Sequence, residues 1–238
     1  MGEILLFSAG LDSFPAWYYL GQPPSVYFDL GHRYAAQERT AIAALAARCA
    51  LEVSISEELR LGEWEAEDAI IPLRNVHLAM LAANHADTVW CIGVKGDRTL
   101  DKSPQAFADM SAFITRLSGH VIRVDSPFWE MTKTQILAWY LGQGLPAEDL
   151  LLTFSCSRAD GEMIHCGACS SCLRRWISLA NNGVPAAFTS PPWEWQRVHE
   201  YYLPAMRQGR YPAHRAEEFF DALATVGLTP AFSTEDRS

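Results

Sequence analysis

Residues 3–13 read Glu3-Ile4-Leu5-Leu6-Phe7-Ser8-Ala9-Gly10-Leu11-Asp12-Ser13, and they decide the fold. Ile4 to Phe7 is a continuous apolar run, typical of a strand buried on both faces of a parallel sheet. Three small residues follow, and Asp12 and Ser13 then favour the start of a helix. A strand, a tight turn and a helix amino terminus together hold phosphate on backbone N–H groups. The stretch therefore predicts a nucleotide site.

The composition fits a folded protein with either one large α/β domain or one domain plus an appendage. The 238 residues are 49% hydrophobic and 20% charged, which allows a substantial core. The formal net charge of −9 argues against broad nonspecific binding to nucleic acid. We find no basic leader before an apolar run, and no segment of the roughly 20 apolar residues that span a bilayer. We therefore expect a cytoplasmic protein that does not enter a membrane.

Apolar runs and helical patterns alternate along the first two thirds of the chain. Residues 25–31 and 88–94 resemble buried strands, while 34–49 and 75–86 carry apolar residues at helical spacing. This alternation implies right-handed crossovers and a doubly wound parallel sheet of the α/β class. Ligands of such sheets lie beyond the carboxyl ends of the strands, where residues 8–13 follow the first strand. Further strands are expected at 51–55 and 120–125, and further helices at 16–20, 107–117, 132–142, 173–181 and 216–226.

Four of the six cysteines crowd together as Cys156, Cys166, Cys169 and Cys172. In a chain of cytosolic character this crowding indicates a metal site rather than disulfides. Four thiolates fill the tetrahedral coordination of Zn²⁺ and leave no place for a catalytic water, so we assign zinc a structural role. An iron–sulfur cluster is the alternative, and His165 could replace one sulfur.

The loop at residues 8–13 resembles the Ser-Gly-Gly-x-Asp-Ser loop of the ATP pyrophosphatases, the PP-loop enzymes that cut ATP between its α and β phosphates. Ser8-Ala9-Gly10-Leu11-Asp12-Ser13 matches this loop at every fixed position except Ala9, where the family usually has Gly. The exchange adds one methyl group beside the phosphates, which we expect to tighten the turn or alter ATP use without abolishing binding. The resemblance implies a Rossmann-like, PP-loop fold.

Further segments resemble one branch of these enzymes, the QueC-type 7-cyano-7-deazaguanine synthases. They follow one another in the family's order between about residues 3 and 183. The segments are Phe28-Asp29-Leu30-Gly31-His32-Arg33-Tyr34 with Glu38, Pro72-Leu73-Arg74-Asn75, Ser126-Pro127-Phe128 with Thr132-Lys133, and Phe154-Ser155-Cys156 with Cys166-Gly167-x-Cys169-x2-Cys172-Leu173-x-Arg175.

The resemblance implies conversion of a carboxylate to a nitrile. The family adenylates 7-carboxy-7-deazaguanine with ATP and, with ammonia, forms 7-cyano-7-deazaguanine (preQ0) for queuosine biosynthesis. Its pattern assigns catalysis to Asp12, Ser13, Arg74 and Lys133, where Asp12 helps to place Mg²⁺ and the two cations neutralise developing charge. By the same resemblance, ATP binding is expected at Ser8, Ala9, Gly10, Leu11, Asp12, Ser13, Phe28, Asp29, Arg33, Asn75, Gly93 and Lys133.

One segment departs from the family's pattern. After the fourth strand the family carries Gly…Asp-x-Ser-Gly-Tyr-Pro-Asp-Cys-Arg, which helps to read the deazaguanine ring. Here Asp101-x-Ser103 remains, but the Tyr-Pro-Asp-Cys-Arg portion is absent. We expect Asp101 and Ser103 in the substrate site, with Asp109 as a second carboxylate. The tail beyond Gly183, with Trp193 and Trp195, is longer than the family needs and is expected to cover the pocket or contact a partner.

Three units are expected along the chain. They are an ATP domain at 1–153, a zinc-binding segment at 154–183 and an aromatic helical extension at 184–238. The leading function is the synthase reaction with small-molecule substrates, and the family resemblance also implies a homodimer. The alternative is the same adenylation used to attach a deazaguanine to a protein or nucleic-acid acceptor. A sulfur-transfer ligase acting on tRNA and a zinc-stabilised binding module without catalysis are the remaining hypotheses.

Overall fold

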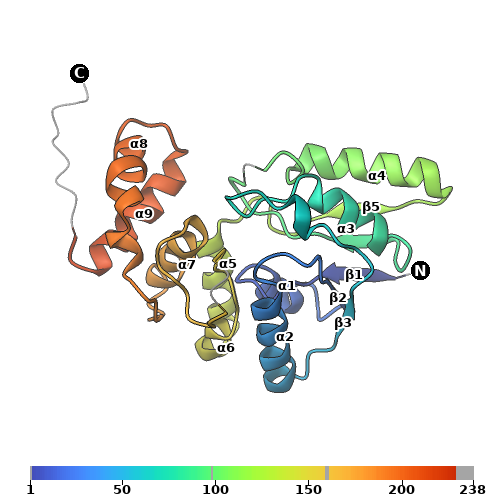
Figure 1. Cartoon of the computed structure of the whole chain (residues 1–238), viewed down its shortest axis with the longest axis horizontal. Helices are drawn as coiled ribbons and strands as arrows, with labels where there is room; N and C mark the ends of the chain where they lie inside the picture. The colour runs from blue at the N-terminus through green and yellow to red at the C-terminus, as the bar shows by residue number, and fades with distance from the viewer. Residues whose placement is uncertain (1, 98, 159–160, 229–238) are drawn as a thin grey trace.

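Within residues 2–97, 99–158 and 161–228, which the computed structural model describes, the chain forms a five-stranded, all-parallel β-sheet covered by helices on both faces (Figure 1). The strands are β1 (Glu3–Leu6), β2 (Ser25–Phe28), β3 (Val53–Ser56), β4 (Thr88–Trp90) and β5 (Arg123–Asp125). Their order across the sheet is β3-β2-β1-β4-β5, so the first strand occupies the centre.

The two faces of the sheet are covered by different helices (Figure 1). One face carries α1 (Ser13–Tyr19), α2 (Ala35–Cys49) and α5 (Lys133–Gly142), and the other carries α3 (Arg74–Ala82) and α4 (Pro104–Ser118). Side chains alternate along each strand, so Leu5 and Phe7 face the first set while Val89 and Val124 face the second. Because helices cover both faces, the central strands β1, β2 and β4 are largely apolar. The edge strand β3 is partly exposed, and its residues alternate between apolar and polar.

The order of the strands reverses between β1 and β4. On one side of β1, Leu5 pairs with Ser25 of β2, and on the other side Ile4 pairs with Val89 of β4. The chain leaves the centre first toward β3 and then toward β5, which opens a crevice outside the carboxyl end of β1. The loop at residues 8–13 follows β1 directly and therefore enters this crevice.

Beyond the sheet the chain continues into a cysteine-bearing segment and a helical extension. The remaining elements are the turn η1 (Gly62–Trp64), α6 (Ala147–Leu151), α7 (Ser170–Ala180), the turn η2 (Pro192–Glu194), the π-helical turn η3 (Val198–Tyr202), α8 (Leu203–Arg207) and α9 (Ala213–Thr225). A separate apolar cluster that includes Trp176, Phe219 and Leu223 joins α9 to α7. Figure 1 accordingly shows α8 and α9 beyond α7, away from the sheet.

The predicted α/β class, parallel sheet and helical tail are confirmed. The helix predicted at 34–49 is α2, which begins one residue later, and the one predicted at 216–226 overlaps α9, which begins at Ala213 and ends at Thr225. Some strands are shorter than the apolar runs that predicted them. For example, β4 ends at Trp90 although the apolar run continues to Val94. Val94 instead forms an isolated bridge with Phe128. The unit boundaries proposed at 153 and 183 stay a prediction, and residues 229–238 of the extension lie outside the described residues.

Short elements escaped prediction. α6 and α8 contain five residues each, fewer than two helical turns, so they show no resolvable apolar period. The helix predicted to begin at 107 begins at Pro104 instead, because Ser103 caps it and proline is favourable in a first turn. None of the helices in the described ranges is both long enough and apolar enough to span a membrane.

Candidate active site

The hydroxyl of Ser13 closes the loop after β1. Ser13 Oγ accepts hydrogen bonds from the backbone N–H of Ser8 (3.3 Å) and of Gly10 (3.1 Å). Ala9 between them has a φ of 51°, the left-handed conformation that costs a non-glycine residue roughly 1 kcal/mol. Two backbone N–H groups thus point to one place at the start of α1, where a bound anion would replace the Ser13 hydroxyl as their acceptor.

The start of α5 brings Lys133 to the start of α1. Thr132 caps α5 through a capping box, accepting from Gln135 N–H at 3.2 Å while its own N–H donates to Gln135 Oε1 at 2.9 Å. Lys133 is the first helical residue, and its ammonium donates to Asp12 Oδ2. The other carboxylate oxygen, Asp12 Oδ1, is buried without a hydrogen-bond partner among the described residues. An unpaired carboxylate oxygen beside an anion-binding loop suits a divalent cation.

Several charges act on Lys133. Burial lowers the pKa of its ammonium below the ordinary lysine value, and the positive charges of Arg174 and Lys102 lower the pKa further. Asp12 and Asp97 act in the opposite direction. Lys133 is therefore held among charges of both signs, and an added polyanion would favour its charged form.

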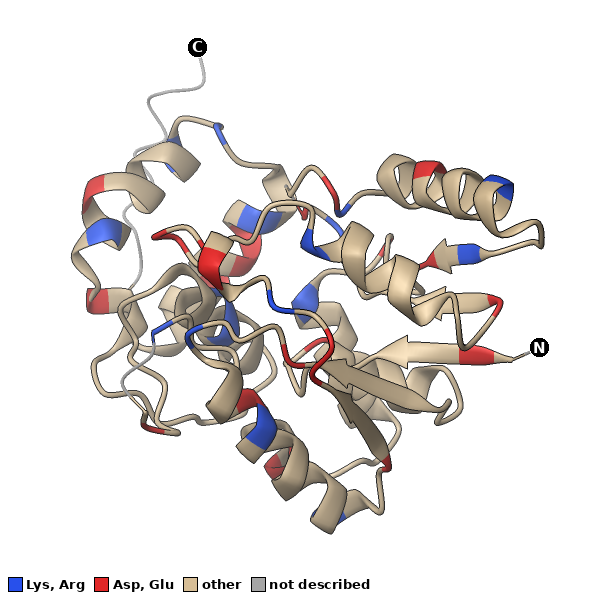
Figure 2. Ribbon diagram, turned by 45° about the vertical axis from the view of Figure 1, so that its right-hand side comes forward, with Lys and Arg blue, Asp and Glu red and all other residues tan. Residues whose placement is uncertain are grey.

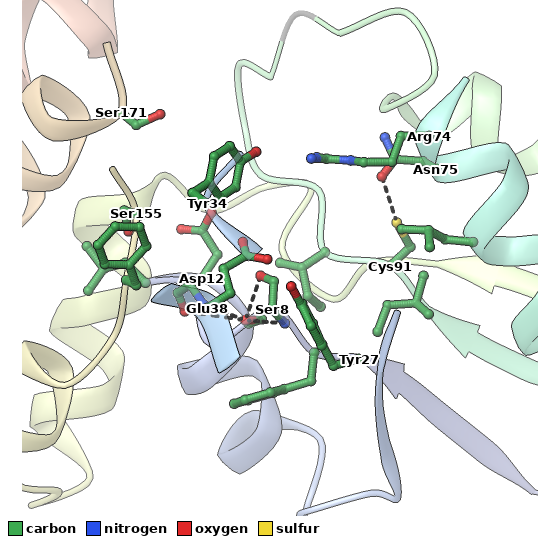
Figure 3. A pocket seen from close by; sticks show the side chains of 18 of the residues that line it. Ser8, Asp12, Tyr27, Tyr34, Glu38, Arg74, Asn75, Cys91, Ser155 and Ser171 are labelled. Atoms are coloured by element: carbon green, nitrogen blue, oxygen red, sulfur yellow. Dashed lines mark hydrogen bonds between the residues drawn. The ribbon is translucent and has the colours of Figure 1, made fainter. Parts of the chain in front are cut away.

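A cavity of about 280 Å³ opens beside the loop. Figure 3 shows Ser8 and Asp12 on one side of it and Arg74 and Asn75, from the start of α3, on the other. Asn75 Oδ1 accepts from the Cys91 thiol at the end of β4 (3.6 Å), which ties the start of α3 to the sheet.

Arg74 extends across the cavity toward Tyr34 (Figure 3). Burial works against the charged form of Arg74, but Tyr34 and Glu38 outweigh it and raise the pKa of the guanidinium. Glu38 also lies 3.0 Å from His32 Nε2. The cavity therefore contains a fixed cation opposite the loop at residues 8–13, which we call the nucleotide loop after the site predicted there.

A second cavity, of about 550 Å³, adjoins the first. Its walls come from the turn after β4, from α7 and from the C-terminal extension. In the turn, Asp97 pairs with Lys102 at 3.0 Å and accepts from Val94 N–H at 3.2 Å. The residues that line both cavities are Tyr34, Arg74, Asn75, Asp97, Lys102, Lys133, Ser157, Ser171 and Arg174.

Cationic side chains gather where the two cavities meet. Lys102, Lys133 and Arg174 line both spaces and come from the turn after β4, from α5 and from α7. Figure 2 shows Lys and Arg positions of separate elements around the middle of the molecule, at the carboxyl ends of the strands. In a chain of net charge −9, this concentration of positive charge favours a polyanionic ligand.

The structure brings most of the predicted ATP and catalytic residues to the first cavity. Those lining it are Ser8, Gly10, Leu11, Asp12, Ser13, Phe28, Arg74, Asn75 and Lys133. Asp101, predicted for the substrate site, lines the second cavity, and its Oδ2 accepts from Asn75 N–H at 3.0 Å.

Three predicted ATP residues of the strand ends and turns lie outside both cavities within the described chain. Asp29 accepts from Gly31 N–H (3.0 Å) and pairs with Arg39 (3.1 Å). Arg33 pairs with Glu65 at 2.9 Å. Gly93 packs so closely against Trp129 that a Cβ atom would lie 2.2 Å from the ring.

Ala9 and two predicted substrate residues also lie outside the cavities as far as the chain is described. The Ala9 side chain is fully buried in the apolar core that includes Phe7 and Leu11. Ser103 caps α4 by accepting from Ala106 N–H at 3.1 Å, and the exposed Asp109 accepts from Gln105 at 2.9 Å.

Arg174, Lys102 and Asp97 line the cavities but were not predicted. Arg174 is exposed and makes no ion pair within the described part of the chain. Its only signal was its place beside Arg175 in the cysteine motif. Asp97 and Lys102 lie in a segment without periodicity, and only the folded turn brings them together.

The four clustered cysteines form a candidate zinc centre. The Sγ atoms of Cys156, Cys166, Cys169 and Cys172 lie within 4.8 Å of one another, and those of Cys166 and Cys172 are 3.8 Å apart. A tetrahedral site with Zn–S bonds of about 2.3 Å has sulfur–sulfur edges of about 3.8 Å. The set therefore fits a single tetrahedral ion, whereas a cluster of several irons would hold the sulfurs farther apart.

The backbone supports the same site. Ala168 N–H donates to Cys166 Sγ (3.3 Å) and Cys172 N–H to Cys169 Sγ (3.4 Å), which stabilises thiolates. Gly167 has a φ of 76°, and a Cβ there would lie 1.7 Å from Ser190 O. Only glycine fits this turn beneath the metal.

The cysteine segment is joined to the nucleotide loop. Phe154 N–H donates to Ala9 O (2.9 Å), and Ser155 N–H donates to His165 Nε2 (3.1 Å). Burial lowers the pKa of His165 to about 3, so the imidazole is a neutral acceptor for Ser155 rather than a substitute for a sulfur. Buried Arg175 donates to Thr153 Oγ1 at 2.6 Å and completes this connection.

The comparisons with known proteins agree with one another. The sequence profile of the family described as queuosine biosynthesis protein QueC matches residues 37–183, more than half of the chain. A 7-cyano-7-deazaguanine synthase of Marinobacter nauticus is 31% identical over 143 residues, which cover 55% of this chain and 62% of that protein.

Two other relatives carry the same description. The 7-cyano-7-deazaguanine synthase of Porphyromonas gingivalis is 25% identical over 137 residues, covering 55% of this chain and 60% of that protein. The one of Archaeoglobus fulgidus is 27% identical over 233 residues, covering 85% of this chain and 95% of that protein. The chain thus spans about three fifths of the length of the Marinobacter and Porphyromonas relatives that it matches.

Proposed function

The chain belongs to the QueC family, and on this premise we propose that it is an ATP-dependent enzyme that converts 7-carboxy-7-deazaguanine and ammonia to 7-cyano-7-deazaguanine. The observation that carries the proposal is the junction of two cavities, one beside the nucleotide loop and one beyond it, with Lys133, Arg74 and Arg174 lining both. A nucleotide phosphate and a second, acidic substrate can meet there.

The first chemical step is adenylation of the acid. A carboxylate oxygen attacks the α-phosphorus of ATP, the bond from that phosphorus to the bridging oxygen breaks, and pyrophosphate leaves. The N–H groups of Ser8 and Gly10 and the charges of Lys133 and Arg174 stabilise the phosphate oxygens as negative charge moves toward the leaving group. Arg74, fixed opposite the loop by Tyr34 and Glu38, aligns the phosphates.

The later steps use the acyl adenylate. Ammonia attacks the carbonyl carbon and AMP leaves, which gives the primary amide. A second activation by ATP, on the amide oxygen, is followed by loss of a phosphate-type product and of the amide protons, which gives the nitrile without any change of oxidation state. Whether the second product is AMP or ADP is decided by direct product analysis.

Two metal ions complete the proposal. Asp12 Oδ1, buried and without a partner in the described residues, would bind Mg²⁺ and so supply further charge neutralisation at the phosphates. The four cysteines would hold Zn²⁺ in a closed site of structural type. Through Phe154 and Ala9 that site supports the nucleotide loop.

The test is product analysis with the purified protein. We expect AMP and pyrophosphate from ATP when 7-carboxy-7-deazaguanine is present, and a nitrile of the expected mass when ammonia is added. Absence of AMP with the acid, under conditions where ATP binds, would reject the proposal.

One observation favours an acceptor other than ammonia for the activated acid. The second cavity, at about 550 Å³, is larger than the first and is lined by the C-terminal extension. The same adenylate could therefore be transferred to an amine of a protein or nucleic acid. AMP formation without nitrile, together with a mass increase on a co-purified macromolecule, would favour this alternative. We also propose a homodimer, which sedimentation equilibrium tests directly.

A further inference from the structure

The C-terminal extension lines one side of the second cavity. Arg197, Tyr202, Tyr211 and Arg215 all belong to the extension and all border this space. Tyr34 borders it from the opposite side, at the start of α2. The aromatic rings offer flat apolar surface and the guanidinium groups offer positive charge, a combination that suits a planar aromatic acid.

The charges of this cavity favour an anion. Lys and Arg outnumber Asp and Glu among its lining residues. The four acids are also engaged with the protein: Asp68 with Ile70 N–H, Asp97 with Lys102, Asp101 with Asn75 N–H, and Glu218 with the Thr132 hydroxyl. Arg174 makes no ion pair in the described ranges. The cations that remain available at the junction with the first cavity are thus placed for the carboxylate of a substrate.

Helix α9 holds the turn that follows β4. Arg215 Nη2 donates to Gly96 O. Gly96 has a φ of 81°, and a Cβ at this position would lie 2.9 Å from Arg215 Nε and 3.1 Å from His214 Nε2. The side chains of the first turn of α9 therefore lie against the backbone of the turn that carries Asp97, and a side chain at residue 96 would have to displace them.

The same helix holds the start of α5. The Thr132 hydroxyl donates to Glu218 Oε1, and Asn181 Nδ2 donates to the Glu218 carbonyl oxygen at 2.8 Å. Thr132 is the capping residue immediately before Lys133. One side chain of α9 thus reaches the residue that sets the direction of the helix carrying Lys133.

We propose that residues 184–228 complete the binding site of the acidic substrate, and that Arg215 and Glu218 of α9 are positioning residues for it. Arg215 fixes the turn after β4, which forms a wall of the second cavity. Glu218 fixes Thr132, and through it the place of Lys133 at the junction of the two cavities. This inference rests on the proposed function for the identity of the acid, but the two contacts exist independently of it.

The decisive variants are Arg215→Ala and Glu218→Ala in the full chain. Arg215→Lys and Glu218→Gln are the conservative partners, since each retains a donor or an acceptor. Arg210→Ala is the matched control, because Arg210 is exposed on the same extension and contacts Gln208.

We expect Arg215→Ala to raise the KM for 7-carboxy-7-deazaguanine about tenfold, since a hydrogen bond of a charged group is lost. The KM for ATP should stay within about twofold, because Arg215 itself lines the second cavity and not the first. We expect Glu218→Ala to lower kcat about tenfold with smaller changes in either KM, and Glu218→Gln to restore most of it. Equal behaviour of these variants and Arg210→Ala, or parallel rises of both KM values, would overturn the proposal.

Hydrogen exchange tests the positioning role of Arg215 and Glu218 independently of the proposed function. Amides of residues 94–103 should exchange faster in Arg215→Ala than in Arg210→Ala, and amides of 132–136 faster in Glu218→Ala, in the absence of any substrate. If the wild-type protein did not turn over the acid but exchange changed in this way, the positioning role would stand and the proposed function would fall. Unchanged exchange would reject the positioning role whatever the turnover.

Discussion

The ammonium of Lys133, at the first position of α5, is hydrogen-bonded to the carboxylate of Asp12, at the start of α1 and 121 residues earlier in the chain. The pair brings two helix starts to the carboxyl end of β1 and leaves one carboxylate oxygen of Asp12 without a partner among the described residues. Cation and carboxylate are thus placed side by side at the nucleotide loop, where one can contact phosphate and the other a divalent ion.

Removal of the Lys133 ammonium is expected to abolish most of the adenylation. We predict that Lys133→Ala lowers the rate of ATP–pyrophosphate exchange about 100-fold or more, because a donor to the developing charge is lost. Asp12→Asn should lower the rate as well and raise the Mg²⁺ concentration needed for half-maximal rate. Arg116→Ala, on the exposed face of α4, is the control. Exchange near the wild-type rate in Lys133→Ala would exclude Lys133 from the chemistry.

The pH dependence of adenylation should report the charges around Lys133. Because burial and neighbouring cations lower the pKa of Lys133 below its ordinary value of 10.5, the rate should fall on the alkaline side before pH 10.5 as the ammonium loses its proton. Asp97→Asn removes a negative neighbour and should move this limb to lower pH. Arg174→Gln removes a positive neighbour and should move it to higher pH. Profiles of kcat/KM against pH measure both shifts. If the two variants moved the alkaline limb in the same direction, this limb would belong to a group other than Lys133.

Ala9 should matter little for ATP. Its side chain is fully buried in the core and has a φ of 51°. In Ala9→Gly, relief of roughly 1 kcal/mol of left-handed strain is offset by the loss of a buried methyl of about 0.8 kcal/mol and by the greater freedom of the unfolded chain. We expect the free energy of unfolding to change by less than about 1 kcal/mol and the KM for ATP by less than about twofold.

Ala9→Val gives the contrasting result. A β-branched residue in a left-handed conformation within a filled core should lower the free energy of unfolding by about 2–3 kcal/mol. Urea unfolding measures both variants. A tenfold change in the KM for ATP in Ala9→Gly would mean that the methyl group contacts the phosphates after all.

Two glycines with similar backbones form a matched test of the zinc centre. Gly167 has a φ of 76° and a Cβ there would lie 1.7 Å from Ser190 O. Gly161 has a φ of 80°, and a Cβ there would have no atom of the described residues within 4 Å, its chain neighbours aside. Gly161→Ala should cost only the left-handed strain of about 1–2 kcal/mol. Gly167→Ala should lower the free energy of unfolding by more than Gly161→Ala does and should also reduce the amount of bound zinc. Urea unfolding measures the first effect and metal analysis the second. Full zinc content in Gly167→Ala would contradict the close fit of this turn beneath the metal.

The features that could be predicted from the sequence are those governed by local pattern. Apolar runs predicted buried parallel strands because a sheet covered on both faces needs apolar residues at successive positions, as Leu5 and Leu6 illustrate. The strand at 51–55 was predicted instead from alternation, as a strand nearer an edge, and β3 is an edge strand. The spacing of Cys166, Cys169 and Cys172 predicted the zinc centre because a knuckle brings near neighbours in sequence to one ion. The residues of the predicted loop line one cavity because Ser8, Gly10 and Ser13 lie within one turn, and nucleotide binding there stays a prediction.

Features that depend on packing between distant elements could not be predicted from the sequence. Arg174 looks like any surface arginine until α7 is placed beside α5, when it faces both cavities. Ser103 fits a family motif but its hydroxyl caps α4, and this competing role is visible only once the helix start is known. The aromatic tail was expected to cover the pocket or contact a partner, and the structure places Tyr202 and Tyr211 along the second cavity.

The hydrogen bond from Phe154 N–H to Ala9 O sets an order of events for the chain as it leaves the ribosome. The loop at residues 8–13 is translated before Lys133, which follows 121 residues after Asp12, and Phe154 and the four cysteines come later still. Because a domain folds as a unit, the loop emerges first and is completed last. Nascent chains that end before the cysteine segment therefore lack the hydrogen bond that holds this loop, and the cavity beside the loop is complete only when the cysteine segment has been made.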